Sequence, residues 1–158
     1  MAARRLVNIV ASERTNSLVQ GGLTVRSQNG LQLPELYKEI EQEKINNWAA
    51  ISGDFNRLHV DPEYATTTSF GGTIAHGPMA LAFLNELMMS WAGAKWAIGG
   101  RLLDVRFKAP IRPGERIKIS GTIKGNCDLD GKQYTECEVY VQKPDGILAV
   151  VGRAFVPF

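Results

Sequence analysis

A segment of almost unbroken hydrophobicity, residues 79–91, constrains the fold more than any other part of the chain. Within it only Asn85, Glu86 and Ser90 are polar, and Pro78 stands just ahead, at a position that suits the first turn of a helix. A helix that is apolar nearly all round is a buried helix, and this one is too short to cross a bilayer. The rest of the chain must therefore wrap it.

The wrapping is predicted downstream, where apolar and polar residues alternate with the period of a half-buried strand. The alternating runs cover residues 103–108, 117–124, 134–141 and 148–156. Turn signals separate them at Pro113-Gly114, Asp130-Gly131 and Asp145-Gly146. We expect an antiparallel meander with one apolar face, and hence an α+β fold in which the sheet curls around the central helix.

A second helix is predicted upstream, where apolar residues recur at helical spacing through residues 45–51. Gly53 provides a stop signal, so residues 54–59 are expected in the loop beyond it. Asp61-Pro62 then begins a further turn or short helix.

The first part of the chain is weakly patterned. We expect residues 1–20 to form a flexible N-terminal extension, because the apolar run after Arg5 is broken by Asn8 and makes a poor secretory signal. One domain is expected over residues 21–158, with an edge strand at residues 23–26.

Length and charge narrow the class of protein. A chain of 158 residues suits one domain with a single core, and a net charge of +2 lacks the strongly basic field of a nucleic-acid-binding protein. No apolar segment is long enough to span a membrane, so we expect no nucleic-acid or membrane partner and a cytoplasmic location. Cys127 and Cys137 flank a turn, so the sequence allows a disulfide between them. Two free thiols are also consistent with a protein of a reducing compartment.

One short stretch carries the chemistry. Residues 53–59 read Gly-Asp-Phe-Asn-Arg-Leu-His, and the only other histidine, His76, precedes the apolar helix. Asp54 and His59 are candidate acid and base groups, while the helix beginning at Gly77 presents free N–H groups and the positive end of its dipole. Together these are a base, an acid and an oxyanion donor, which reactions beside a carbonyl require.

These residues resemble the MaoC-like dehydratases, a family that includes the (R)-specific enoyl-CoA hydratases. The resemblance rests on residues 53–59, on Asp61-Pro62 with Ala65, and on Ile-Ala-His-Gly at residues 74–77. A second stretch, Phe-Lys-Ala-Pro-Ile-Arg-Pro-Gly-Glu at residues 107–115, is similar to another recurring part of the family.

The resemblance implies a hot-dog fold, a homodimer whose sheets join edge to edge, and a substrate tunnel at or near the interface. It also implies addition of water to trans-2-enoyl thioesters, or its removal from (R)-3-hydroxyacyl thioesters, with no metal or redox cofactor. The substrate would carry coenzyme A or an acyl carrier. Asp54 and His59 would share the acid–base work as a coupled pair, and the Gly77 N–H would polarise the thioester oxygen.

Four further residues are candidates for substrate binding. Asn56 is expected to fix the loop through its own hydrogen bonds. His76 either lines the pocket or makes a structural hydrogen bond at the helix start. Arg57 stands where the family commonly has proline, and Asn85 stands where some hydratases carry a small hydroxyl residue; Asn85 faces either the pocket or a buried polar partner. Among the basic residues Arg57, Arg106, Lys108 and Arg112, we expect Arg57 first to meet coenzyme A phosphates.

Three alternatives remain open from the sequence. A thioesterase of the same fold would also use a carboxylate, and a tailoring dehydratase would act on a metabolite that is not a thioester. A non-catalytic ligand-binding protein is the third, against which the presence of Asp54, His59 and Gly77 argues.

Overall fold

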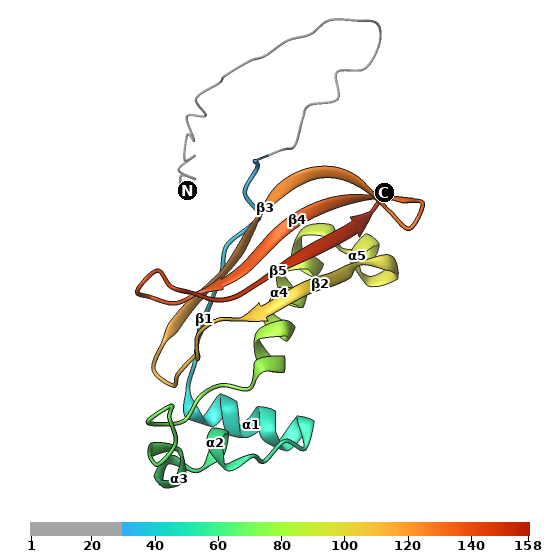
Figure 1. Cartoon of the computed structure of the whole chain (residues 1–158). Helices are drawn as coiled ribbons and strands as arrows, with labels where there is room; N and C mark the ends of the chain where they lie inside the picture. The colour runs from blue at the N-terminus through green and yellow to red at the C-terminus, as the bar shows by residue number, and fades with distance from the viewer. Residues whose placement is uncertain (1–29) are drawn as a thin grey trace, which may run out of the picture.

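A computed structural model describes residues 30–158, so the predicted N-terminal extension at 1–20 and the edge strand at 23–26 lie outside the described residues. Figure 1 shows one curved sheet, with α4 along one face and three short helices gathered at one end. The elements run β1 (Leu36–Glu39), α1 (Gln42–Ser52), α2 (Arg57–Val60), α3 (Pro62–Thr66), α4 (Gly77–Ala92), α5 (Ala94–Gly99), β2 (Arg101–Phe107), β3 (Arg116–Leu129), β4 (Lys132–Gln142) and β5 (Leu148–Pro157).

The apolar helix α4 packs against β3, β4 and β5, as its composition predicts. Leu84, Leu87 and Met88 are completely buried against the sheet. Met89 is 44% exposed, because the single sheet covers the helix from one side only. The predicted α+β class is confirmed, and no helix within residues 30–158 is long and apolar enough to span a membrane.

The strand order corrects the predicted meander. The sheet is antiparallel with the order β1-β3-β4-β5-β2, so only the last three strands in sequence follow one another as a meander. The strand β2 lies beside β5 at one edge, and β1, which the sequence pattern did not indicate, takes the place beside β3. The alternation of residues within a strand does not depend on which distant strand lies beside it, so the sequence pattern did not predict this strand order.

A β-bulge changes the face that β2 presents to the core. Leu103 pairs with Arg153 and Arg106 with Val151, so Asp104 and Val105 together oppose one residue of β5. Asp104 has a φ of 54°, in the left-handed region. As a result Leu102 and Val105 pack on the core, whereas Leu103 and Phe107 are exposed, and the predicted inward position of Leu103 is wrong.

The predicted turn at Asp130-Gly131 is confirmed as the connection between β3 and β4. Both residues have positive φ, 55° and 74°, as a two-residue hairpin turn of the primed type requires. In the resulting register Cys127 opposes Tyr134 and Cys137 opposes Ile123. The two thiols are therefore not neighbours, and both cysteines are free.

Candidate active site

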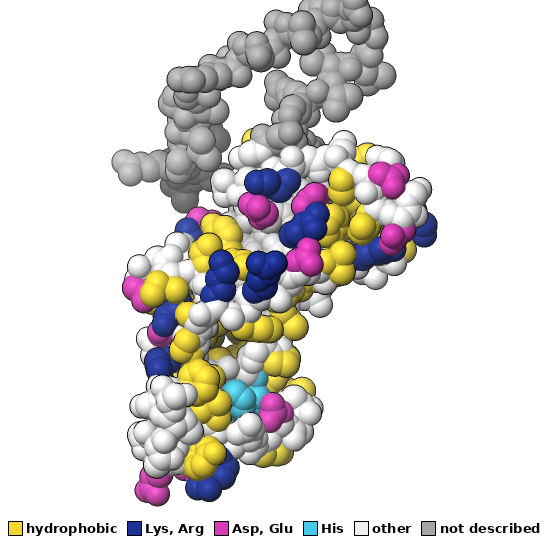
Figure 2. Space-filling model, viewed as in Figure 1, with side chains coloured by type: hydrophobic (Ala, Val, Ile, Leu, Met, Phe, Trp, Pro, Cys, Tyr) yellow, Lys and Arg dark blue, Asp and Glu magenta, His cyan; other side chains and the backbone are white. Residues whose placement is uncertain are grey.

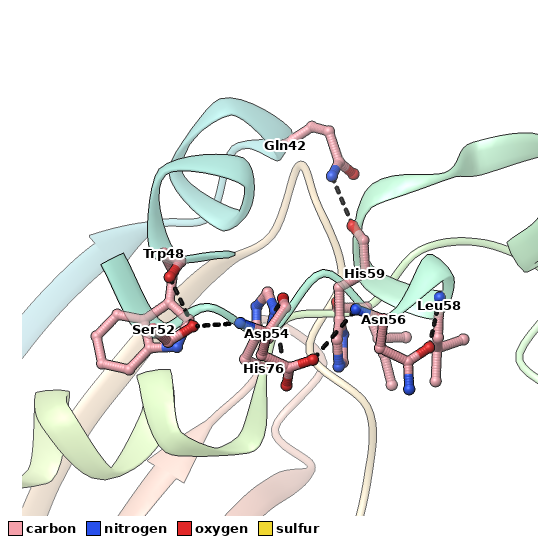
Figure 3. Close-up of polar contacts among 9 residues, drawn as sticks. Gln42, Trp48, Ser52, Asp54, Asn56, Leu58, His59 and His76 are labelled. Carbon is pink, nitrogen blue, oxygen red and sulfur yellow. Dashed lines mark hydrogen bonds and ion pairs between the residues drawn. The ribbon is translucent and has the colours of Figure 1, made fainter. Parts of the chain in front are cut away.

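The end of α1 delivers Asp54 to the site. Gly53 closes the helix with a φ of 76°, a left-handed conformation that glycine adopts without strain, and its N–H donates to the Ala49 carbonyl at 2.8 Å. Directly after it, the Asp54 carboxylate accepts a hydrogen bond from the Asn56 N–H at 3.1 Å, which folds the loop into an Asx turn (Figure 3).

Asn56 fixes the loop after Asp54 through its own hydrogen bonds, as expected. Its side-chain oxygen accepts from the Leu58 N–H at 3.0 Å and caps α2. Residues 57–60 are therefore a helical turn rather than the open loop that the sequence suggested, because Asn56 supplies a start signal within the motif itself.

Hydrogen bonds to its ring and to its backbone carbonyl orient His59. Its Nδ1 lies 2.8 Å from the Ile74 carbonyl oxygen, and since a carbonyl only accepts, Nδ1 carries the proton. In the neutral ring, Nε2 is then the free acceptor. The backbone carbonyl of His59 accepts from the Gln42 side chain at 2.7 Å, and the other end of that amide accepts from Thr73 at 2.6 Å. Neither Gln42 nor Ile74 carried a sequence signal for this role.

His76, at the start of α4, meets both Asp54 and His59. Its Nε2 lies 2.9 Å from the Asp54 carbonyl oxygen and 4.0 Å from the carboxylate oxygen Oδ2. The rings of His59 and His76 stack with centroids 3.9 Å apart (Figure 3). The three side chains can bring ligand atoms within 4.8 Å of one another, a donor set that suits a divalent ion, so a metal-free site stays a prediction.

An apolar cavity of about 320 Å³ opens beside this cluster. His59, His76 and Gly77 contribute its polar wall, and Lys108 adds a cation. The apolar wall includes Phe70, Ile74, Ala80, Phe107, Ile111 and Val150. Figure 2 shows an imidazole at the surface beside an acidic side chain, between the sheet and the short helices. The sequence pattern indicated none of these apolar residues as parts of a site.

Gly77 presents its backbone to the cavity. It is the first residue of α4, and within residues 30–158 its N–H has no hydrogen-bond acceptor, while the dipole of this 16-residue helix adds positive potential there. A Cβ at this position would lie 3.2 Å from the Phe107 ring, so glycine keeps the approach to the N–H open.

Three of the predicted substrate-binding residues, Asn56, Arg57 and Asn85, are not among the residues that line the cavity, and neither is Asp54. Arg57 donates two hydrogen bonds to one carboxylate oxygen of Asp61, at 2.9 and 2.8 Å, and its guanidinium lies 4.4 Å from the Tyr64 ring centre. The Tyr64 N–H, and after it Arg57, lowers the pKa of Asp61 below its ordinary value. Asn85 accepts a hydrogen bond from the Trp96 indole, which is the polar-partner alternative for this residue.

Comparison with known proteins adds to this geometry. The family model described as "MaoC like domain" matches residues 24–143. The 3-hydroxyacyl-thioester dehydratase Z of Mycobacterium tuberculosis is 44% identical over 93 residues, which cover 57% of this chain and 62% of that protein. The (R)-specific enoyl-CoA hydratase of Rhodospirillum rubrum is 30% identical over 72% of this chain and 86% of its own length.

Solved structures agree with the fold. The (R)-hydratase from A. caviae involved in PHA biosynthesis superposes with a TM-score of 0.66 at 28% identity, over 85% of this chain and 99% of that one. An unliganded R-hydratase, PhaJ1 from Pseudomonas aeruginosa, gives a TM-score of 0.67 at 27% identity, over 82% of this chain and 80% of that one. The described sheet and central helix are therefore those of a hot-dog fold.

Proposed function

The chain belongs to the MaoC-like dehydratase family, and on that basis we propose that it is a hydratase/dehydratase of acyl thioesters. It adds water to trans-2-enoyl thioesters or removes water from (R)-3-hydroxyacyl thioesters. One observation carries the proposal: the Asp54 carboxylate lies within 4.8 Å of the His59 imidazole, and His59 lines an apolar cavity together with Gly77, whose N–H has no acceptor within residues 30–158. The activities for which two relatives are named, 3-hydroxyacyl-thioester dehydratase and (R)-specific enoyl-CoA hydratase, support it.

In this mechanism Asp54 and His59 hold one water molecule between them. One group of the pair takes a proton from the water as its oxygen bonds to C3, and the pair returns a proton to C2 from the same face. The electrons of the double bond move toward the thioester carbonyl, whose oxygen accepts from the Gly77 N–H. Such a donor typically contributes about 3 kcal/mol of transition-state stabilisation.

The cavity suits the acyl part of such a substrate, because most of its wall is apolar. The carrier part of the bound substrate, coenzyme A or an acyl carrier protein, extends from the mouth of the cavity into solvent. The reaction needs no redox cofactor or metal, since the pair and the helix N–H supply acid, base and oxyanion donor.

The direct test mixes the purified protein with crotonyl-CoA and follows the loss of the conjugated thioester absorbance. Asp54→Asn and His59→Ala should each lower kcat by roughly 100-fold or more, the usual contribution of a general acid or base. Glu63→Gln, which makes the same chemical change on an exposed carboxylate nearby, should leave kcat within about twofold of wild type, as exposed sites do.

Equal activity in wild type and the Asp54 and His59 variants would contradict the assignment. Release of free thiol at the rate of absorbance loss would indicate the thioesterase alternative. A protein that binds crotonyl-CoA without changing it would be the ligand-binding alternative, and one inert toward all thioesters would favour a metabolite dehydratase.

A further inference from the structure

His76 is an unusual polar residue for its place in the fold. It is 1% exposed, and the described core holds one other buried polar side chain, Ser120. Although His76 occupies the N-cap of α4, its side chain makes no capping hydrogen bond. The common reason for a polar residue at a helix start is therefore missing.

The side chain instead reaches across 22 residues of sequence to the loop that carries Asp54. Nε2 lies 2.9 Å from the Asp54 carbonyl oxygen, and since that oxygen only accepts, Nε2 carries the proton. The other nitrogen, Nδ1, is buried and has no hydrogen-bond partner within residues 30–158. The ring therefore donates one hydrogen bond, and the acceptor is the backbone carbonyl of Asp54.

The same ring also defines the place of His59. Its face stacks on the His59 ring at 3.9 Å between centroids, while the Ile74 carbonyl holds the edge of His59 by the hydrogen bond to Nδ1. The contact with the His76 ring, whose plane is tilted by 32° from that of His59, and the hydrogen bond at Nδ1 restrain the orientation of His59 and leave Nε2 free. The residue after His76 is Gly77, which begins α4 and whose backbone lines the cavity.

We propose that His76 is the positioning residue of this site: its buried imidazole sets Asp54, His59 and the Gly77 N–H in register with one another. The proposal rests on the proposed hydratase/dehydratase activity and assigns to His76 neither a proton transfer nor a contact with substrate. An error of about 1 Å in the placement of reacting groups costs on the order of 100-fold in rate, so such a residue acts on kcat rather than on KM.

Two amide substitutions separate the hydrogen bond from mere polarity. The nitrogen of glutamine stands as many bonds from Cβ as histidine Nε2, whereas that of asparagine matches Nδ1. His76→Gln therefore keeps the donor to the Asp54 carbonyl, and His76→Asn removes it. We expect His76→Asn to lower kcat for crotonyl-CoA about 100-fold with KM changed less than threefold. His76→Gln, which loses only the stacked ring, should stay within about tenfold of wild type.

Ser120→Ala provides the matched control for loss of a buried hydrogen bond. The Ser120 hydroxyl donates to the Leu33 carbonyl at 3.2 Å, on the sheet and away from the cavity. This variant should lower Tm as His76→Asn does and leave kcat unchanged. If His76→Asn does not fold, His76→Phe, which keeps the ring without the donor, takes its place with the same expected loss of kcat.

Three results would overturn the proposal. Equal losses in His76→Gln and in the variant without the donor would show that the hydrogen bond is not the cause. Wild-type kcat in His76→Asn would show that the position is irrelevant. A rise in KM at constant kcat would show that His76 binds the substrate instead.

A measurement independent of turnover separates this proposal from the proposed function. Long-range ¹H–¹⁵N NMR spectra of the histidine rings should show His76 protonated at Nε2 and His59 at Nδ1. A proton on Nδ1 of His76 overturns the proposal even in an active protein. An inactive wild type with both expected tautomers would reject the hydratase/dehydratase function and leave the arrangement around His76 standing.

Discussion

Arg57 lies within the active loop, yet its guanidinium is engaged by Asp61, four residues further on, and by the Tyr64 ring. The spacing of four is that of an ion pair on a helix, a signal that was readable once residues 57–60 are taken as helical. Lys108, by contrast, is exposed, lines the cavity, and has no carboxylate partner within residues 30–158. The cation that is better placed to meet a carrier phosphate is therefore Lys108.

Lys108→Ala should raise KM for crotonyl-CoA about fivefold, which corresponds to about 1 kcal/mol, the size of an exposed ion pair. KM for crotonyl-pantetheine, which lacks the nucleotide phosphates, should change less than twofold, and the difference should shrink as salt is raised. Arg57→Ala, assayed in parallel, should have the smaller effect on the CoA substrate. A larger effect at Arg57 would instead support the expectation drawn from the sequence.

The candidate acid–base residues could be chosen from the sequence because their spacing is local. Asp54, Asn56 and His59 lie within six residues of chain, where the Asn56 N–H donates to the Asp54 carboxylate and the His59 N–H donates to the Asn56 carbonyl. The partners that orient them come from Gln42, Ile74 and His76. Contacts across such distances depend on how α1 packs against α2 and the loop before α4, which no local pattern encodes.

At the scale of the element, the strands also combine features that a local sequence pattern predicts with features that it does not. The alternating runs predicted β3, β4 and β5, and the Asp130-Gly131 turn fixed the register of the first pair. The bulge at Asp104 was not predictable, because an extra residue in an edge strand leaves the composition of the strand unchanged. It displaces Leu103 outward and places Phe107 at the cavity beside Gly77.

The start of α4 gives a test at this scale. Gly77→Ala keeps the N–H but adds a methyl group 3.2 Å from the Phe107 ring, inside the cavity. We expect kcat/KM for crotonyl-CoA to fall about tenfold, since one methyl group in a pocket is worth roughly 10- to 200-fold. Tm should not fall, because alanine is the better helix former.

Gly72→Ala makes the same change outside the cavity, where the added Cβ meets only an arginine nitrogen at ordinary contact distance, 3.6 Å. Its kcat/KM should equal that of wild type. An unaffected Gly77→Ala would indicate that the thioester does not approach the start of α4.

At the scale of the whole molecule, β2 is an open edge of the sheet, paired with β5 alone within the described chain. Leu103 is 38% exposed and Phe107 55% exposed on this strand, and Ile98 in the adjoining α5 is 86% exposed. An unpaired edge with exposed apolar side chains favours addition of another strand. We expect a homodimer in which the β2 edges of two copies meet, next to the cavities that Phe107 lines.

Replacing Ile98 and Leu103 together by lysine should convert the dimer to a monomer in sedimentation equilibrium. Leu31→Lys, at an exposed apolar residue beside the opposite edge of the sheet, should leave the mass of wild type unchanged. A dimer that survives at β2 but dissociates in Leu31→Lys would place the contact at the β1 side instead.

The position of β5 has a consequence for the order of folding. This strand, the last element of the chain, lies between β4 and β2, and its Val150 forms part of the cavity wall. During synthesis β2 emerges well before β5, the strand with which it pairs. Until residues 148–157 emerge, β2 therefore stays unpaired beside a hydrophobic helix. We expect the nascent chain to gain the cavity only once β5 pairs with β4 and β2, and until then to expose the apolar surface that chaperones recognise.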